Sequence, residues 1–196
     1  KLLMRKLRIK NMEISKNSVD QAGVKLRQTQ NDEVALDILA AWRGRHVYPL
    51  NLAFVLLKKQ TDKVGNNAAY GQRLKRVSSI LHKLKRLPKA RLSRLQDIGG
   101  CRVILSNYEK LRELYIKLKK SKSILPRYKD YITYPKDDGY RGIHLIYKCG
   151  SKDPEFAGLE IEFQLRTKLQ HAWATTVEII DSFDGENIKL GKGSKN

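Results

Sequence analysis

Residues 159–166 (LEIEFQLR) alternate strictly between apolar and polar side chains, and no other stretch constrains the fold as strongly. Successive side chains of a strand point to opposite faces of a sheet. One face would carry Leu159, Ile161, Phe163 and Leu165, and the other Glu160, Glu162, Gln164 and Arg166. The pattern predicts a strand with its apolar face on a core. The polar face is either a salt-bridged solvent face or the lining of a cleft, where a carboxylate takes a hydroxyl proton beside a metal ion.

Shorter apolar runs predict four further strands, at residues 69–76, 101–105, 128–133 and 143–148. The strand at 101–105 (CRVIL) is entered through a turn at Gly99-Gly100. Helical periodicity surrounds and separates the strands. We expect helices from a Ser15 cap to Gln30, through 34–42, and at 77–87, 108–118 and 168–183, with residues 43–51 as a connector.

This order of elements predicts an α/β (α+β) domain with a mixed central β-sheet flanked by helices. Residues 1–65 are expected to form a helical lead-in and residues 66–185 the main domain. Residues 186–196 are expected to be a frayed or truncated end, because they lack apolar periodicity.

The chain carries 40 Lys and Arg residues against 20 Asp and Glu, a formal net charge of +20. A surface of that sign attracts polyanions such as nucleoside polyphosphates, RNA or an acidic partner, unless it is simply an overcharged surface. Cys101 and Cys149 have no CxxC pairing and no histidine at zinc spacing, so we expect apolar fillers in a reducing cytoplasm. No apolar run approaches the ~20 residues that cross a bilayer, so no membrane is expected.

A dense basic segment, residues 73–86 (RLKRVSSILHKLKR), joins a predicted strand to a predicted helix. Arg73 and Lys75 share one face of the strand, and Ser79 and Lys83 share one face of the helix. Cations beside a helix N-terminus make an anion site, because free backbone N–H groups and the helix dipole assist them. The segment predicts either a phosphate site or a solvated basic helix face.

Two further segments hold candidate functional residues. Asp97 precedes the Gly-Gly pair and either caps a turn or holds Mg²⁺ on a triphosphate, since Mg²⁺ prefers hard oxygen ligands. Within residues 129–147, an exposed Tyr140 ring can stack on a base while Arg141 or His144 meets phosphate or sugar. The alternative is that Tyr140 and His144 pack at a strand edge.

Four motifs occur in order over about residues 70–175: R-x-K-x-x-x-S-I-x-x-K, D-I-x-G-x-R, K-D-Y-I-x-x-P-K-x-x-G-Y-R-x-I-H and E-x-Q-x-R-T. Together they resemble the synthetase domain of the RelA/SpoT family. The resemblance implies a nucleotidyltransferase-like fold. It also implies transfer of the β,γ-pyrophosphate of ATP to the 3′-hydroxyl of GDP or GTP, which makes the alarmones ppGpp and pppGpp.

The resemblance further implies a role for each matching residue. On the donor side, Arg73 and Arg102 flank the adenine of ATP, and Lys75, Ser79 and Lys83 hold its phosphates. Asp97 carries Mg²⁺, and Glu162 shares the metal or acts as the base on the 3′-hydroxyl. On the acceptor side, Tyr140 stacks on the base, and the remaining acceptor residues are Arg141, His144, Gln164, Arg166 and His171.

Alternatives remain for the acceptor. His171 and the segment HAWATTVEIIDSF resemble a branch that contains toxins of toxin–antitoxin pairs, which implies an antitoxin protein as a possible partner. Some members of that branch place pyrophosphate on the 3′ end of tRNA, and others make adenosine alarmones. From another class, a non-catalytic RNA-binding module fits the charge of +20 but gives no reason for Asp97 and Glu162 among so many cations.

Overall fold

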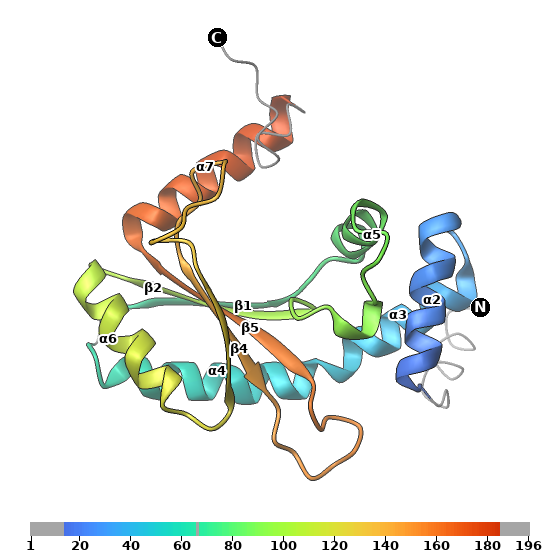
Figure 1. Cartoon of the computed structure of the whole chain (residues 1–196), viewed down its shortest axis with the longest axis horizontal. Helices are drawn as coiled ribbons and strands as arrows, with labels where there is room; N and C mark the ends of the chain where they lie inside the picture. The colour runs from blue at the N-terminus through green and yellow to red at the C-terminus, as the bar shows by residue number, and fades with distance from the viewer. Residues whose placement is uncertain (1–13, 66, 185–196) are drawn as a thin grey trace.

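Five strands form one mixed sheet in the computed structural model, which describes residues 14–65 and 67–184 (Figure 1). The strands are β1 (Ala69–Leu74), β2 (Gly99–Leu105), β3 (Ile124–Asp130), β4 (Ile143–Lys148) and β5 (Glu160–Thr167). Their spatial order is β1-β2-β5-β4-β3, with β2 and β5 parallel and the other pairs antiparallel. The expected mixed sheet with flanking helices is confirmed.

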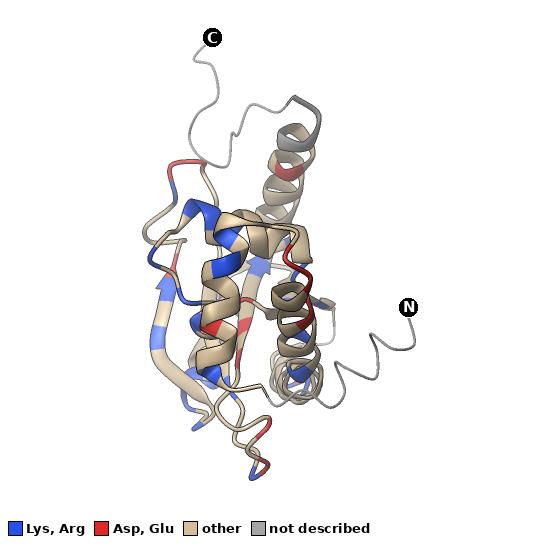
Figure 2. Ribbon diagram, turned by 90° about the vertical axis from the view of Figure 1, so that its right-hand side faces the viewer, with Lys and Arg blue, Asp and Glu red and all other residues tan. Residues whose placement is uncertain are grey.

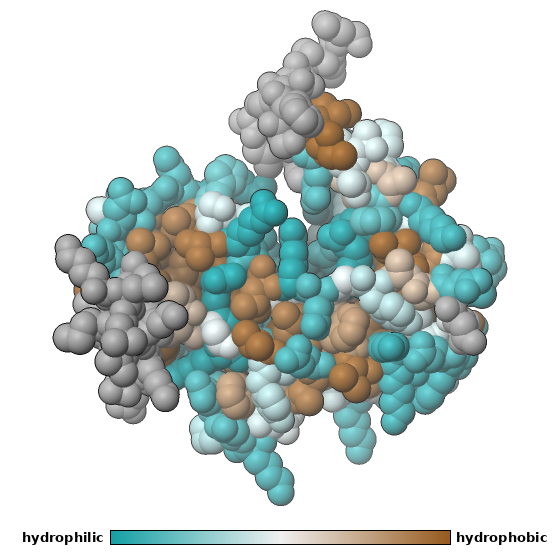
Figure 3. All heavy atoms as spheres, turned by 180° about the vertical axis from the view of Figure 1, so that it is seen from behind, coloured by the Kyte–Doolittle hydropathy of each residue, from teal (hydrophilic) through white to brown (hydrophobic). Residues whose placement is uncertain are grey.

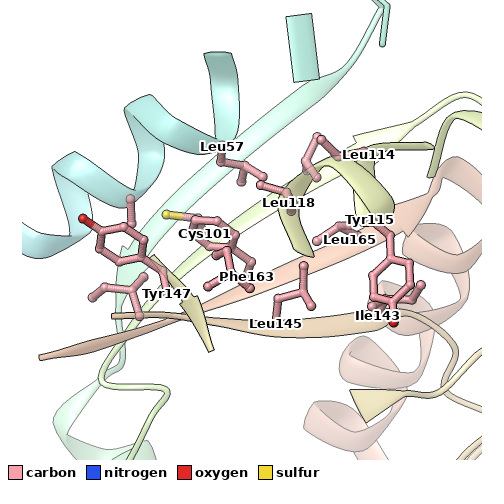
Figure 4. Packing of buried hydrophobic residues seen from close by; sticks show 14 of the residues in the cluster. Leu57, Cys101, Leu114, Tyr115, Leu118, Ile143, Leu145, Tyr147, Phe163 and Leu165 are labelled. Atoms are coloured by element: carbon pink, nitrogen blue, oxygen red, sulfur yellow. The ribbon is translucent and has the colours of Figure 1, made fainter. Parts of the chain in front are cut away.

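The apolar face of the sheet carries the main core. It packs against α4 (Val47–Asp62) and α6 (Tyr108–Lys119), which lie on the same side of the sheet (Figure 1). Figure 4 shows Leu57 of α4 and Leu118 of α6 gathered with Cys101 and Phe163 of the strands. Phe163 is fully buried while Glu162 and Gln164 beside it are not, so the alternation in β5 has the predicted consequence.

Two helices lie on the other side of the sheet. α5 (Val77–Arg86) and α7 (Lys168–Asp184) stand apart from each other there, and α7 projects away from the body (Figure 1). Seen from behind, apolar side chains remain uncovered on the projecting part of α7 (Figure 3), where Ile179 is 51% exposed. Part of the polar face of the sheet is therefore left without a covering helix.

A helical pair precedes α4 and packs on α5. α2 (Lys16–Gln28) begins at the predicted Ser15 cap, whose side chain accepts from the Ser18 backbone, and α3 (Glu33–Arg45) follows. Buried residues of α2, α3 and α5, including Leu26, Leu39 and Leu84, form a second core cluster. This cluster holds α5 beside the sheet.

Two arginines of this pair bond directly to the segment that carries the basic residues. Arg27 Nε donates to the carbonyl of Leu84 at 3.3 Å, near the end of α5. Arg43 Nε donates to the carbonyl of Lys75 at 2.8 Å. The helical pair therefore fixes the position of the backbone on both sides of residues 76–83.

The connector predicted at residues 43–51 is wrong. α3 runs to Arg45, and α4 begins two residues later at Val47. A proline in the first turn of a helix loses no hydrogen bond, because its N–H would have no partner there. Pro49 is buried in that first turn.

The turn predicted at Gly99-Gly100 is also wrong, because both residues belong to β2. Gly99 pairs with Ile161 and Gly100 with Glu162 in the parallel ladder. A Cβ atom on Gly99 would lie 2.6 Å from Ile161 Cδ1, so Gly99 packs closely on β5 within a strand, and a side chain there would make the end of Ile161 shift.

The strand expected at 128–133 runs instead from Ile124 to Asp130. It ends there because Asp130 Oδ1 accepts from the backbone N–H groups of Ile132 and Thr133, at 3.0 and 3.1 Å. A carboxylate that accepts from the backbone N–H groups that follow it gives them an alternative to hydrogen bonds with a neighbouring strand.

Positive charge is spread over the described residues and is not confined to one element. Figure 2, which looks onto α2 and α3, shows Lys and Arg on helices, strands and loops, with Asp and Glu interspersed among them. None of the described helices combines the length and apolar character that a membrane span needs. The predicted end at 186–196 and the first 13 residues of the lead-in lie outside the described residues.

Candidate active site

A cavity of about 210 Å³ opens on the polar face of the sheet. Its lining comes from β1, β2, β5 and α7, together with Lys75 and Asp97 in the connections between elements. The predicted residues that line it are Arg73, Lys75, Asp97, Arg102, Glu162 and Gln164. Residues far apart in the sequence thus meet because neighbouring strands present the same face.

The cavity has two arginines at diagonal positions and two glycines opposite them. In the antiparallel ladder Arg73 pairs with Gly100, and Arg102 pairs with Gly71. Directly opposite residues share a face of the sheet. A Cβ on Gly71 would meet nothing within 4 Å, and one on Gly100 only a backbone oxygen at 3.7 Å. The glycines therefore leave an open floor between two guanidinium groups, which suits a flat ring.

Asp97 lies between two lysines. Lys75 Nζ is 2.9 Å from Oδ2 and Lys83 Nζ is 2.8 Å from Oδ1. Burial by itself would raise the pKa of Asp97, but the charges and hydrogen bonds of Lys83 and then Lys75 outweigh it and hold the pKa below its usual value. The carboxylate is ionised at neutral pH and holds both ammonium groups, and Asp97 and Lys75 line the cavity.

Among the described residues, the carboxylate of Glu162 is bonded to an imidazole and an amide, and not to a lysine or arginine. His144 Nδ1 is 3.0 Å from Oε1, and Gln164 Nε2 donates to Oε2 at 2.7 Å. Burial would raise the pKa of Glu162, but the bond from His144 and its charge, and then the bond from Gln164, hold it below its usual value. Glu162 is therefore an ionised carboxylate at neutral pH and a possible proton acceptor.

These bonds belong to a closed ring that links five predicted residues. Arg166 donates from Nε to Tyr140 Oη at 3.1 Å and from Nη2 to Gln164 Oε1 at 3.2 Å. Tyr140 Oη lies 2.6 Å from His144 Nε2, and His144 and Gln164 both reach Glu162. Because a carboxylate only accepts, His144 Nδ1 carries a proton in either charge state of the ring.

The Tyr140 ring is half-buried, where the sequence suggested an exposed ring. It lies edge-on to Tyr131 and His144, with centroids 5.6 Å away in each case, and Lys136 Nζ lies 4.8 Å from its centroid. Burial is the largest cause that raises the pKa of Tyr140, so the hydroxyl stays neutral. The contacts arise because the loop after β3 folds back over the polar face, which local sequence does not reveal.

His171 comes to the same region from the first turns of α7. Burial, followed by the charges of Arg102 and Arg166, lowers its pKa, so the three side chains lie near one another. The predicted site residues Ser79 and Arg141 do not line the cavity. Ser79 is exposed on α5, and the exposed Arg141 donates to the carbonyl of Gly139 at 3.1 Å.

Sequence reasoning missed two kinds of lining residue. Gly71 was predicted only as part of a strand and Gly100 as part of a turn, although a glycine at a polar-face position of a strand next to an arginine is a signal for an open floor. Glu178 of α7 lines the cavity as well. Its place depends on the direction of α7, and no local pattern predicts it.

The carboxylates fit a metal ion that is shared with a polyphosphate. Asp97 and Glu162 line one cavity, and the charge of Asp97 acts to raise the pKa of Glu162. Among the described residues no group of three or more His, Cys, Asp or Glu side chains could form a closed metal cage. Two carboxylates with phosphate oxygens and water are what Mg²⁺ uses in nucleotide sites.

Comparisons with known proteins agree on one family. The family model described as "Region found in RelA / SpoT proteins" matches residues 72–180. The GTP pyrophosphokinase YjbM of Bacillus subtilis (strain 168) is 33% identical over 110 residues, 53% of this chain. The GTP pyrophosphokinase YwaC of the same organism is 31% identical over 110 residues, again 53% of this chain. The chain spans about half the length of these curated relatives, 51% and 52% respectively.

The fold is also that of a solved relative. The small alarmone synthetase 1 from Bacillus subtilis matches with a TM-score of 0.60 at 25% identity, over 74% of this chain and 81% of that one. The match confirms the sheet and helix arrangement expected from the sequence.

Proposed function

The chain belongs to the RelA/SpoT family, and we propose that it is an ATP-dependent pyrophosphokinase that acts on the 3′-hydroxyl of a guanosine nucleotide. One observation carries this proposal. Asp97, bridged by two lysines, and Glu162, held by His144 and Gln164, line a single cavity together with Arg73, Lys75 and Arg102. A solvated salt-bridge surface would not need two half-buried carboxylates held ionised by different partners.

The donor lies over β1 and β2 in this proposal. The adenine sits on the floor left by Gly71 and Gly100, flanked by Arg73 and Arg102. Arginine planes stack well on flat rings. The phosphates of ATP then reach Lys75 and Lys83. The two ammonium groups exchange contacts with Asp97 for contacts with phosphate oxygens. Those contacts are charge-assisted hydrogen bonds.

The transfer step is a displacement at the β-phosphorus of ATP. The acceptor 3′-oxygen forms a bond to that phosphorus, the bond to the α,β-bridging oxygen breaks, and AMP leaves. The hydroxyl proton goes to Glu162, which His144 and Gln164 keep ionised and oriented. Charge spreads over phosphate oxygens during the transfer, so positioning and nearby cations supply most of the rate enhancement.

Asp97 and Glu162 would hold Mg²⁺ at this site. A bound Mg²⁺ ion would neutralise part of the negative charge of the polyphosphate. The acceptor binds on the other side of Glu162, where Tyr140 offers its ring to the base. Lys136 and Arg166 lie beside that ring.

A panel of acceptors tests the proposal. The protein is incubated with ATP labelled at the γ-phosphate and, separately, with GDP, GTP, ADP or deacylated tRNA. The proposal expects label in a new guanosine product with GDP or GTP. Label in an ADP product or in tRNA would keep the donor chemistry and replace the acceptor. No labelled acceptor in any arm would reject the transferase.

A tRNA acceptor is the second candidate, favoured by the net charge of +20. RNA affinity grows with the number of phosphates neutralised and falls steeply with salt. The two acceptors therefore separate in a salt titration. Activity that falls by orders of magnitude between low and moderate salt favours tRNA, and a shallow response favours a mononucleotide.

A further inference from the structure

A second cavity lies beside the active site and takes no part in the reaction proposed above. Its volume is about 540 Å³, within the range of roughly 300–1,000 Å³ that small-molecule sites occupy. The lining comes from the start of α2, the end of α3, residues 93–96, β3 and the start of β5. It therefore sits where the helical pair meets the sheet.

Two buried rings line this cavity. Trp42 is 3% exposed and His46 is 2% exposed, and their ring centroids are 5.1 Å apart in an edge contact. Trp42 Nε1 is buried and has no hydrogen-bond partner in the described structure. Buried indole N–H groups usually have one, so this donor calls for a ligand or water.

His46 offers the complementary group. Its Nδ1 lies 2.8 Å from the carbonyl oxygen of Trp42, which only accepts, so Nδ1 carries the proton. Burial, partly offset by that bond, lowers the pKa of His46 to about 4, so the ring is neutral at physiological pH. Nε2 is then an acceptor. Trp42 and His46 thus place one donor and one acceptor, one helical turn apart, among the residues that line the cavity.

Cations gather at the rim. Lys16, Arg94 and Arg127 are exposed and line the cavity, against one acid, Glu160. Arg127 Nη2 and Gln96 Nε2 both donate to that carboxylate, the latter at 3.0 Å. The lining thus has an excess of positive charge that a phosphate group would neutralise.

We propose that this cavity is a binding site for a phosphorylated nucleoside, with its base against Trp42 and His46 and its phosphates at Arg94, Arg127 and Lys16. The site is separate from the ATP and acceptor positions. It is nevertheless connected to them, because Gln96 precedes Asp97 and Glu160 shares the polar face of β5 with Glu162.

The two tryptophans of the chain make the site measurable. Trp42 lies in the cavity and Trp173 in α7, so Trp173→Phe leaves Trp42 as the only tryptophan. The fluorescence of that protein is titrated with GDP, with ADP and with inorganic pyrophosphate. We expect a saturable change with a nucleotide, and weaker binding of pyrophosphate alone.

Two matched substitutions decide where the signal arises. Arg94→Gln removes a rim cation, and Arg91→Gln makes the same change three residues earlier on an exposed position outside the cavity. Arg94→Gln should weaken binding about ten-fold or more, as loss of a charge-assisted bond does, while Arg91→Gln leaves it unchanged. Circular dichroism confirms that each variant is folded.

A third variant separates this site from the proposed ATP site. Lys83→Ala lies in the proposed ATP site, and it should leave the Trp42 titration unchanged. The proposal is overturned if no nucleotide gives a saturable change up to millimolar concentrations. It is equally overturned if Lys83→Ala abolishes the change while Arg94→Gln retains it, or if pyrophosphate binds as tightly as the nucleotides.

Discussion

The imidazole of His144 is bonded to the carboxylate of Glu162, with Nδ1 3.0 Å from Oε1. After burial, this bond and its charge are the largest influences on the pKa of Glu162, and they lower it. The relationship matters for function because a base must be ionised to take a proton, and burial alone would favour the protonated form.

Replacing His144 with Leu should raise the pKa of Glu162, since burial then prevails. If ionised Glu162 takes the hydroxyl proton, the acidic limb of the profile of kcat/KM against pH moves to higher pH. The control is Lys148→Leu, an exposed residue at the end of the same strand. If the acidic limb of His144→Leu stays at the wild-type pH, the bond from His144 does not control the pKa of the catalytic base.

Asp97 gives a prediction about stability and pH. Its pKa is lower in the folded protein than the unfolded value of about 3.9, so it stabilises the fold above that pH. The stabilisation is lost as pH falls through the folded pKa. Asp97→Asn should therefore lower Tm near neutral pH, and the difference from wild type should shrink below about pH 4. A difference that is constant with pH would contradict the ion pairs with Lys75 and Lys83.

The open floor of the cavity yields a steric prediction. Gly100→Val places a branched side chain between Arg73 and Arg102, in a strand whose backbone accepts it, because Gly100 is not among the glycines with positive φ. The crowding should cost ATP binding about 1–3 kcal/mol, roughly ten-fold or more in Kd. Calorimetric titration with a non-hydrolysable ATP analogue measures it.

Gly150→Val is the matched control for that experiment. Gly150 is exposed after β4, and a Cβ there would meet nothing within 4 Å. It should leave ATP affinity unchanged. If the Gly100 and Gly150 variants bind the ATP analogue with equal affinity, the adenine does not lie on the floor between Arg73 and Arg102.

Tyr140 separates the ring from the hydroxyl. Tyr140→Ala removes the stacking surface and should weaken acceptor use by about 1–3 kcal/mol, roughly ten-fold or more, with ATP binding intact. Tyr140→Phe keeps the ring but removes the hydroxyl that bonds to His144 and Arg166. It should keep the acceptor KM and lower kcat. If Tyr140→Ala weakens ATP binding and spares the acceptor, the two nucleotide positions are reversed.

Strand β5 shows how far sequence alone reaches. Its alternation predicted both faces, and the structure puts Phe163 in the core and Glu162 in the cavity. Helix α5 was also predictable, because short-range periodicity decides it. Local patterns succeed where a side chain's direction follows from its own element.

The parts that failed depend on contacts between elements. Gly99 and Gly100 belong to β2 because they pair with Ile161 and Glu162 of β5, and Pro49 lies in the first turn of α4, which packs on the sheet. The ring from Arg166 to Glu162 joins β4, β5 and a loop. No single segment contains the information that closes it, so the hydroxyl of Tyr140 looked dispensable in the sequence.

The fate of the pyrophosphate tests the central claim most directly. Wild-type protein and Asp97→Asn are incubated with γ-labelled ATP, Mg²⁺ and GDP, and AMP and labelled guanosine product are counted together. The account predicts one AMP for each labelled product in wild type, and a rate lower by orders of magnitude in folded Asp97→Asn. Release of ADP and labelled phosphate in place of AMP, or near-normal turnover by Asp97→Asn, would contradict it.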